Sequence, residues 1–313
     1  MKKVEIVEVG LRDGLQNEKR VIANDVKVEM ALRLADAGVR RMEIAAFVRA
    51  DKIPQMAGSK EVTEKVLSLQ KQKKISQNVI FSALVPNEKG MQEALATGVK
   101  EVAVFASCTE SFSQANINCS IEESFERFKP VFQIAKKNKI KVRGYLSVCF
   151  GCPYEGDVPA KKVVELAVRL FKMGCYEISI GDTIGVATPE QVQQLFGKLK
   201  KRIPVKKLAG HFHDTRGTAL ANILMAYEHG IKVFDASLGG LGGCPYAPGS
   251  AGNVATEDVI YMFRGMNVET GLKIEKYIEL NHWMSGNMQK ELPSKVSKAG
   301  LFQARPFKTK GVV

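Results

Sequence analysis

The chain of 313 residues lacks several features that define special classes of protein. It has no run of about 18 apolar residues, the length of a transmembrane helix, so no membrane partner is expected. Its first residues form neither an apolar segment nor an Arg/Ser-rich leader, which predicts a cytoplasmic protein. The six cysteines are widely spaced, and the Cys149/Cys152 pair has no second pair at zinc-ribbon spacing. We therefore expect reduced thiols that mostly pack in the core.

Nucleotide-binding signatures are also absent. No G-x-G-x-x-G follows the first strand pattern and no G-x-x-x-x-G-K-[ST] occurs, which argues against a dinucleotide-binding or P-loop fold. The 46 Lys+Arg outnumber the 33 Asp+Glu, and the net charge is +13. These lysines are scattered over predicted helix ends and connections without interleaved aromatic residues, so a basic soluble surface explains them better than nucleic-acid binding does.

Short β-rich runs alternate with longer helical patterns along the chain. Strands are predicted at residues 4–9, 41–47, 78–85, 101–107, 141–149, 176–182, 207–213 and 232–238. Helices are predicted near residues 24–37, 58–71, 88–97, 121–138, 159–173, 188–200, 216–229 and 253–265. This alternation within residues 4–265 is typical of a (β/α)₈ TIM barrel, with an open doubly wound sheet as the alternative. A helix near 272–288 and a basic tail follow, and we predict one catalytic domain over residues 1–313.

Glycine and proline mark several helix boundaries. Gly38, Gly98, Gly174 and Gly230 each stand just beyond the last apolar residue of a predicted helix. Glycine accepts the left-handed conformation that ends a helix, so each should lead into the next strand. Pro189 in Thr-Pro-Glu predicts a helix start, since proline is tolerated in the first turn.

Polar side chains gather where the predicted strands end. Active sites of TIM barrels lie at the carboxyl ends of the strands, so these residues should meet at one mouth of the barrel. In chain order they are residues 12–18, Glu43, Arg143, Tyr145, Asp182, Thr183, His211, His213, the glycine-rich 239–246 and Asn253. Chance would distribute them over both ends of the barrel.

Two of the four histidines, His211 and His213, are separated by one residue. In a strand their side chains point the same way, and two neutral imidazoles form half of a metal site. The alternative is two polar residues where a strand runs out into a loop. Asp13 and Asn253 would add oxygen ligands and no thiolate, a set that suits Mg²⁺ or Mn²⁺ better than structural zinc.

Arg12 and Cys244 each permit two interpretations. Arg12, beside Asp13, is either the ion-pair partner of that carboxylate or an electrophile that stabilises a developing oxyanion. Cys244 lies in the glycine-rich loop, where a thiol could reach a substrate as proton donor or nucleophile. Its alternative role is an inert packing residue.

Several ordered segments resemble the 3-hydroxy-3-methylglutaryl-CoA (HMG-CoA) lyase family of the DRE-TIM metallolyase superfamily, in its bacterial type. They are residues 9–18 (VGLRDGLQNE), 116–120 (NINCS), 151–156 (GCPYEG), 181–185 (GDTIG), 211–215 (HFHDT), 239–249 (GGLGGCPYAPG), 252–253 (GN) and 255–258 (ATED). The resemblance extends from about residue 4 to about residue 290. It implies a TIM barrel that cleaves HMG-CoA to acetyl-CoA and acetoacetate with Mg²⁺ or Mn²⁺. It also suggests a homodimer.

The resemblance further implies a role for each matching residue. The implied metal ligands are Asp13, His211, His213 and Asn253. Arg12 would stabilise the enolate of the departing acetyl-CoA and Cys244 would protonate it, with Glu43 and Asp182 completing the polar network. Either His211 or Asp182 would help to remove the hydroxyl proton. The implied substrate or CoA contacts are Gln16, Asn116, Tyr145 and Thr183.

The chain departs from the family pattern at two places. Leu11 stands where many lyases have proline before the Arg-Asp pair, and related Claisen-condensing synthases begin with the same Leu-Arg-Asp-Gly. Ala45 and Ala46 follow Glu43 where many members have hydroxyl side chains. The alternative function is therefore a related lyase or a Claisen-condensing enzyme that acts on a different hydroxyacyl-CoA or 2-oxo acid.

Overall fold

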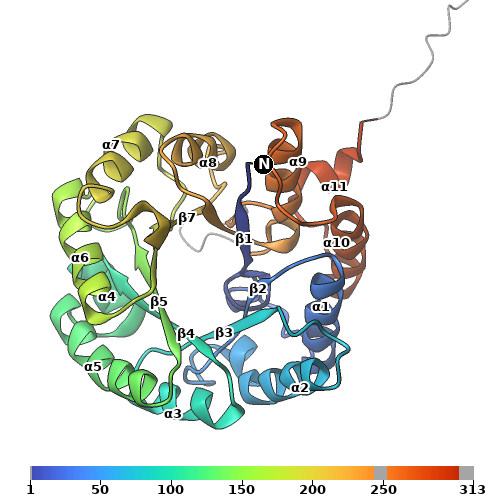
Figure 1. The fold of residues 1–313 in the computed structure, drawn as a ribbon, viewed down its shortest axis with the longest axis horizontal. Helices are drawn as coiled ribbons and strands as arrows, with labels where there is room; N and C mark the ends of the chain where they lie inside the picture. The colour runs from blue at the N-terminus through green and yellow to red at the C-terminus, as the bar shows by residue number, and fades with distance from the viewer. Residues whose placement is uncertain (1, 243–251, 303–313) are drawn as a thin grey trace, which may run out of the picture.

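A closed barrel of eight parallel strands forms the centre of the computed structural model, which describes residues 2–242 and 252–302. Each strand pairs with its neighbours in chain order, and β8 closes the barrel against β1 (Figure 1). The strands are β1 (Glu5–Glu8), β2 (Arg41–Ala46), β3 (Ile80–Leu84), β4 (Glu101–Ser107), β5 (Lys141–Ser147), β6 (Glu177–Asp182), β7 (Leu208–Phe212) and β8 (Val233–Ala236). The predicted TIM barrel is confirmed, and the open sheet is excluded.

The strand sequences suit a sheet that is covered on both faces. All six residues of β2 and all six of β6 are buried, as expected for parallel strands surrounded by helices. β5 ends two residues before its predicted end. Val148 there has a φ of 53°, and its N–H donates to Thr183 Oγ1 at 2.8 Å. This bond turns the chain out of the barrel and joins the ends of β5 and β6.

A ring of helices surrounds the barrel, one after each strand (Figure 1). They are α1 (Asn24–Asp36), α2 (Ser59–Lys71), α3 (Glu88–Thr97), α5 (Ile121–Lys137), α6 (Ala160–Met173), α7 (Pro189–Leu199), α8 (Ala219–Glu228) and α9 (Thr256–Gly265). The four predicted glycine stops are confirmed, with φ between 87° and 112°. The predicted start of α7 is confirmed too, because Thr188 forms a capping box with Gln191.

Several short helical elements were not predicted from the sequence. They are α4 (Glu110–Ile117), α11 (Lys295–Ala299) and the helical turns η1 (Gly10–Gly14), η2 (Pro54–Met56), η3 (Val205–Lys207) and η4 (Leu238–Gly240). Each has eight residues or fewer, which is too short for an apolar period to show. The predicted C-terminal helix is confirmed as α10 (Ile274–Met288). Among the described residues, no helix is long and apolar enough to cross a membrane.

The C-terminal helices hold the segment that follows β8. Tyr277 of α10 donates its hydroxyl to Glu8 of β1 at 3.0 Å. The Glu257 carboxylate of α9 accepts the N–H of Gly239 in η4 at 2.9 Å and the amide of Asn281 in α10 at 2.9 Å. Gly239 needs its φ of 63° here, and a side chain at this position would collide with Leu292. The base of the glycine-rich loop is thus fixed in position.

Candidate active site

The two histidines after Gly210 do share one side of the chain. His211 lies in β7 and His213 follows that strand, and both are 8% exposed. Their Nε2 atoms are 3.1 Å apart, while Phe212 between them packs against Phe150 in the core. The alternation of side chains along a strand therefore produces the predicted pair.

Asp13 of η1 completes a cluster with these histidines. Its Oδ2 is 3.8 Å from His211 Nε2, and one ligand atom from each of the three residues lies within 4.8 Å of the others. Burial raises the pKa of the Asp13 carboxyl, but Arg12 and the two histidines outweigh this effect and lower the pKa to about 2. Asp13 is therefore an ionised acceptor at neutral pH.

Asn253 reaches the same cluster from the far side of the glycine-rich loop. It forms an isolated antiparallel bridge with His213, and its Nδ2 donates to Asp13 Oδ2 at 2.8 Å. The Val254 N–H donates to the Phe212 carbonyl at 3.2 Å, which keeps this segment against the end of β7. The structure thus brings together all four implied ligands.

The cluster fits a hard divalent cation. Two metal–ligand bonds of about 2.1 Å at a right angle would separate their ligand atoms by roughly 3 Å, close to the observed Nε2–Nε2 distance. Burial lowers the pKa of His213 to about 3, and His211 adds to this effect, so the His213 ring is uncharged at neutral pH, as a metal ligand must be. Oxygen and imidazole donors without a thiolate are typical of Mg²⁺ or Mn²⁺ sites.

Arg12 takes part in an ion pair and also faces the cavity. Its Nε donates to Glu43 Oε2 at 2.5 Å and its Nη1 to Asp13 Oδ1 at 2.6 Å. Burial alone would lower the pKa of Arg12, but the carboxylates of Glu43 and Asp13 raise it above its ordinary value. Arg12 can therefore be both the ion-pair partner of Asp13 and an electrophile for a developing oxyanion, since this permanent cation also lines the cavity.

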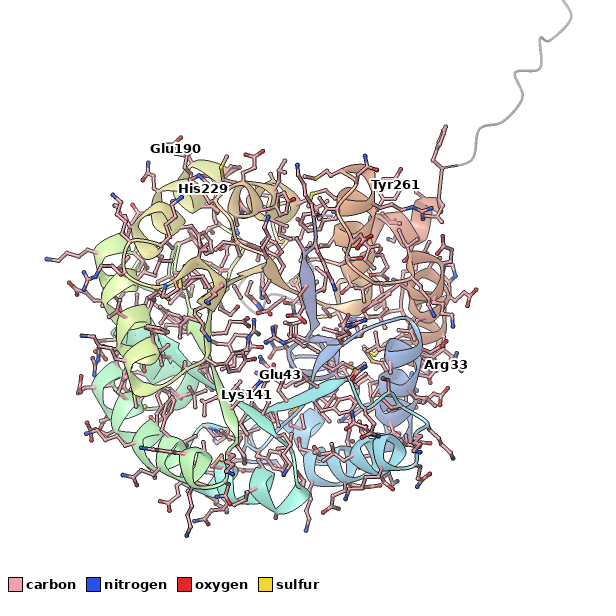
Figure 2. All side chains as sticks on the ribbon, in the orientation of Figure 1. Arg33, Glu43, Lys141, Glu190, His229 and Tyr261 are labelled. Atoms are coloured by element: carbon pink, nitrogen blue, oxygen red, sulfur yellow. The ribbon has the colours of Figure 1, made fainter. Side chains whose placement is uncertain are left out.

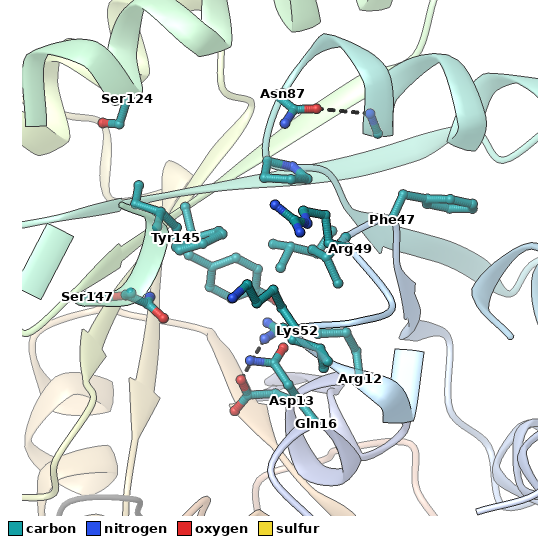
Figure 3. A pocket seen from close by; sticks show the side chains of 18 of the residues that line it. Arg12, Asp13, Gln16, Phe47, Arg49, Lys52, Asn87, Ser124, Tyr145 and Ser147 are labelled. Carbon is teal, nitrogen blue, oxygen red and sulfur yellow. Dashed lines mark hydrogen bonds and ion pairs between the residues drawn. The ribbon is translucent and has the colours of Figure 1, made fainter. Parts of the chain in front are cut away.

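A cavity of about 1510 Å³ opens at this end of the barrel (Figure 3). All four predicted substrate contacts line it: Gln16, Asn116, Tyr145 and Thr183. Basic side chains line it as well, namely Arg49, Lys52, Lys89 and Arg127. The cavity thus combines a metal-like cluster with several basic side chains, and its volume could hold a large anionic molecule.

Asp182 is close to the cluster but turned away from the cavity. Its two oxygens accept the backbone N–H groups of Val186 at 2.9 Å and Ala187 at 3.1 Å. Burial raises the pKa of its carboxyl to about 6 against these hydrogen bonds. The neighbours Gly181 and Thr183 line the cavity, whereas Asp182 itself does not.

Cys244, the predicted proton donor, lies outside the described residues. The described part of its loop ends at Gly242, which lines the cavity with a φ of 107°. A Cβ on Gly242 would stand 2.8 Å from Asn253 Nδ2. The five described cysteines are free and buried, as expected for packing residues.

Ala45 and Ala46 do not line the cavity. Both are buried. The Ser59 hydroxyl of α2 donates to the Ala46 carbonyl at 2.8 Å and accepts the Ala46 N–H at 3.2 Å. The cavity wall after β2 begins at Phe47. The absence of hydroxyl groups at 45 and 46 therefore removes no polar group from the lining.

One polar residue near the cluster was missed from the sequence. Asp235 of β8 lies 3.2 Å from His211 Nδ1, and Ser179 Oγ donates to the same carboxylate oxygen at 2.7 Å. In the sequence, Asp235 could be noticed only as a single carboxylate within the apolar run Val-Phe-Asp-Ala. Its hydrogen-bond and ion-pair partners come from other strands. Its importance was visible only once β6, β7 and β8 were adjacent.

Comparison with known proteins agrees with this arrangement. The HMGL-like family model matches residues 3–283. The chain belongs to the HMGL-like family. A 3-hydroxy-3-isohexenylglutaryl-CoA/hydroxymethylglutaryl-CoA lyase from Pseudomonas aeruginosa is 47% identical and aligns over 97% of this chain and 99% of its own length. The mitochondrial hydroxymethylglutaryl-CoA lyase of Gallus gallus is 46% identical over 95% of this chain and 97% of its own.

One similar solved structure contains bound ligands. The structure of an HMG-CoA lyase from Acinetobacter baumannii in complex with coenzyme A and 3-methylmalate superimposes with a TM-score of 0.91. It is 32% identical, and the match covers 98% of each chain. This HMGL-like chain therefore shares the whole fold of that CoA-binding enzyme.

Proposed function

We propose that the protein cleaves HMG-CoA to acetyl-CoA and acetoacetate in a reaction that depends on a divalent cation. The observation behind this proposal is the cluster of Asp13, His211 and His213 beside Arg12 at the mouth of a large barrel cavity. Nearly full-length identity of 46–47% to lyases of this name supports the same reaction.

Four side chains would hold the cation: Asp13, His211, His213 and Asn253. When bound, Mg²⁺ or Mn²⁺ supplies a Lewis acid for oxygens of the substrate. The remaining chemistry belongs to the chain itself. The Arg12 guanidinium lies where it can donate to the thioester oxygen as that oxygen becomes an enolate. Glu43 and Asp13 hold its Nε and Nη1, which fixes the direction of the other donors.

Two proton transfers complete the cleavage. A base removes the proton of the tertiary hydroxyl, the C2–C3 bond breaks, and its electrons move into the thioester to form the enolate of acetyl-CoA. The candidates for this base are His211, which lines the cavity, and Asp182, whose two oxygens accept backbone N–H groups outside the cavity lining. The Cys244 thiol then protonates the enolate carbon.

The acyl-CoA would extend from the cluster toward the basic part of the cavity. Gln16, Asn116, Tyr145 and Thr183 line the cavity and would contact the substrate or CoA. The phosphates of CoA carry several negative charges, and Arg49, Lys52 and Lys89 would face them. A cytoplasmic location and a homodimer remain predictions.

A broader range of acyl groups is a second candidate function. The Pseudomonas aeruginosa relative is named for an isohexenyl substrate as well as HMG-CoA. In this chain the cavity wall contains the apolar side chains of Phe47, Val48, Leu84 and Phe105. A 3-hydroxyglutaryl-CoA with a longer 3-alkyl group would bury that group here. Equal kcat/KM for HMG-CoA and such a substrate would support this, whereas cleavage of HMG-CoA alone would exclude it.

A coupled assay for acetoacetate and acetyl-CoA tests the main proposal. Protein treated with EDTA should be inactive, and added Mg²⁺ or Mn²⁺ should restore cleavage of HMG-CoA. The matched control is His213→Ala, which removes one ligand and should need more cation for the same rate. Folded, cation-supplied protein that leaves HMG-CoA intact would contradict the proposal.

A further inference from the structure

The rings of His211 and His213 are held differently. His211 Nδ1 lies 3.2 Å from the Asp235 carboxylate, and its Nε2 faces His213 and Asp13. The Nδ1 of His213 is buried, and within residues 2–242 and 252–302 it has no hydrogen-bond partner. A carboxylate therefore fixes the orientation of His211, and no described side chain does the same for His213.

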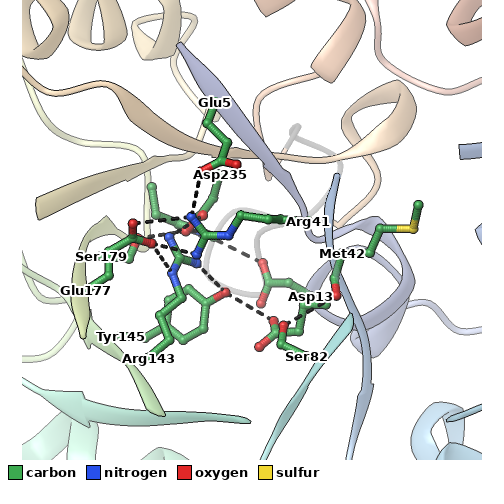
Figure 4. A network of polar contacts seen from close by, with 12 residues as sticks. Glu5, Asp13, Arg41, Met42, Ser82, Arg143, Tyr145, Glu177, Ser179 and Asp235 are labelled. Carbon is green, nitrogen blue, oxygen red and sulfur yellow. Dashed lines mark hydrogen bonds and ion pairs between the residues drawn. The ribbon is translucent and has the colours of Figure 1, made fainter. Parts of the chain in front are cut away.

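Asp235 is placed by the barrel itself. It lies on β8 in register with His211 of β7, and it is 2% exposed. Ser179 Oγ of β6 donates to its Oδ2 at 2.7 Å, and Arg143 Nη2 of β5 forms an ion pair with its Oδ1 at 2.8 Å (Figure 4). Four consecutive strands thus contribute to one contact, which gives it little freedom to move.

We propose that Asp235 is a positioning residue for the metal site. It accepts the Nδ1–H of His211 and so leaves Nε2 unprotonated and directed at the cation. A histidine ligand must offer a lone pair, and the hydrogen bond of the other ring nitrogen decides which nitrogen has the proton. The inference rests on the function proposed above, since it assumes a cation between Asp13, His211 and His213.

The same carboxylate connects the cation site to Arg12. Arg143 donates from Nη1 to the Tyr145 hydroxyl at 2.8 Å, and that hydroxyl donates to Glu43 Oε2 at 3.3 Å. Glu43 in turn holds Arg12. A continuous series of polar contacts therefore runs from Asp235, the partner of His211, to the Arg12 guanidinium that would stabilise the enolate. Loss of the Asp235 carboxylate should change the orientation and tautomer of His211 more than those contacts, because His211 is its direct partner.

Asp235→Asn separates the charge of this side chain from its shape. All three neighbours of the carboxylate, Arg143, Ser179 and His211, present hydrogens or positive charge to it. An amide nitrogen placed away from Arg143 would face Ser179 and His211 Nδ1. His211 can accept that hydrogen only in its other tautomer, which moves the proton to Nε2, the nitrogen that faces the cation.

The first measurement is cation affinity. We expect Asp235→Asn to bind Mn²⁺ about 10- to 100-fold more weakly, in a titration that follows free Mn²⁺ by electron paramagnetic resonance. Ser179→Ala is the matched control, because it removes one hydrogen bond to Asp235 but keeps the carboxylate. Its loss should be roughly threefold. Equal affinity in wild type and Asp235→Asn would overturn the proposal.

The second measurement needs no substitution. Long-range ¹H–¹⁵N spectra of the Mg²⁺-loaded wild type should show His211 protonated at Nδ1, and a proton at Nε2 would overturn the proposal even if Asp235→Asn fails to fold. Neither measurement uses HMG-CoA. Absent lyase activity with the expected tautomer and affinities would contradict the proposed function alone.

Discussion

The two ends of the barrel interior both contain buried charges, but they are arranged differently. At the amino end of the strands, Arg41 pairs with Glu177 at 2.9 Å and Glu5 at 3.0 Å, and it also contacts the Tyr176 hydroxyl (Figure 4). Arg143 pairs with the same Glu177 at 2.8 Å. Among the described residues, no side-chain atom of Arg41 or Glu177 is buried without a hydrogen-bond partner, and the Arg143 Nη2 that lacks one forms an ion pair with Asp235.

At the mouth the charges are less completely paired. Among the described residues, Gln16 Oε1, Glu43 Oε1 and His213 Nδ1 are buried without hydrogen-bond partners. Figure 2 shows Glu43 inside the ring of helices, whereas Arg33 and Glu190 lie at its periphery. Unsatisfied buried polar atoms are costly, and they persist where a ligand completes them.

This difference distinguishes two uses of the same residue types. The paired charges at the amino end are suited to stabilise the barrel, whereas the unpaired polar atoms at the mouth are left for a ligand to contact. Arginine next to carboxylates is common to both ends, so its function depends on which contacts remain unfilled. Substitutions at the two ends should therefore have separable effects.

The largest effect on turnover is expected from Cys244→Ser. Because a hydroxyl is a far poorer acid than a thiol, kcat should fall by about 10²- to 10⁴-fold while substrate binding is kept. Single-turnover kinetics with HMG-CoA would measure this. The buried Cys175→Ser serves as a control for a thiol far from the mouth, and a kcat near that of wild type in Cys244→Ser would remove Cys244 from the mechanism.

At the amino end, Arg41→Gln should reduce stability rather than catalysis. Removing this cation leaves the buried carboxylates of Glu101 and Glu177 short of compensating charge, so the free energy of unfolding should fall by about 3–5 kcal/mol. Urea unfolding followed by circular dichroism would measure the loss. The folded variant should keep the wild-type KM, and a changed KM would contradict the separation of the two ends.

At the mouth, Arg12→Gln should show the opposite pattern. The loss of one donor to the developing enolate is expected to lower kcat by about 10²- to 10³-fold, with a much smaller change in KM. Steady-state kinetics at saturating cation would separate the two constants. If KM alone changes, Arg12 positions the substrate and does not stabilise the transition state.

The smallest expected effect is on the pH dependence of stability, and it comes from the Glu257 carboxylate, which accepts the Gly239 N–H at the base of the glycine-rich loop. Burial raises the pKa of Glu257 to about 7, above the ordinary value of 4.5. The folded state then binds more protons than the unfolded state between these values, so this group's contribution to stability is present below 4.5 and is lost as pH rises through about 7.

Glu257→Gln tests that assignment. Its unfolding free energy should depend less on pH between about 4.5 and about 7 than that of the wild type. Thermal or urea unfolding of both proteins across this range gives the comparison. Parallel curves would mean that Glu257 is ionised throughout, held by the Gly239 and Asn281 donors.

Much of the site could be predicted because each part has a local signature. His211 and His213 follow from the alternation of side chains along a strand, and Asp13 follows from its place just after the first strand. The four glycine stops follow from backbone conformation alone. The family resemblance then connected these parts with one reaction.

Asp235 and the closed network at the amino end could not be found in this way. Asp235 becomes meaningful only beside Ser179, His211 and Arg143, which come from three other strands. Arg41 and Glu177 are far apart in the chain, and no periodic pattern connects them. Contacts of this kind depend on the register between strands.

The sequence by itself determined the strand–helix alternation, the helix ends and the residue types at each strand end. These depend on backbone preference and on the period of apolar residues, which act over a few neighbouring positions. Only the tertiary structure decided which nitrogen of His211 faces Asp235, which carboxylate holds Arg12 and which buried atoms stay unpaired. Those outcomes depend on distances of about 3 Å between strands, set when the barrel closes.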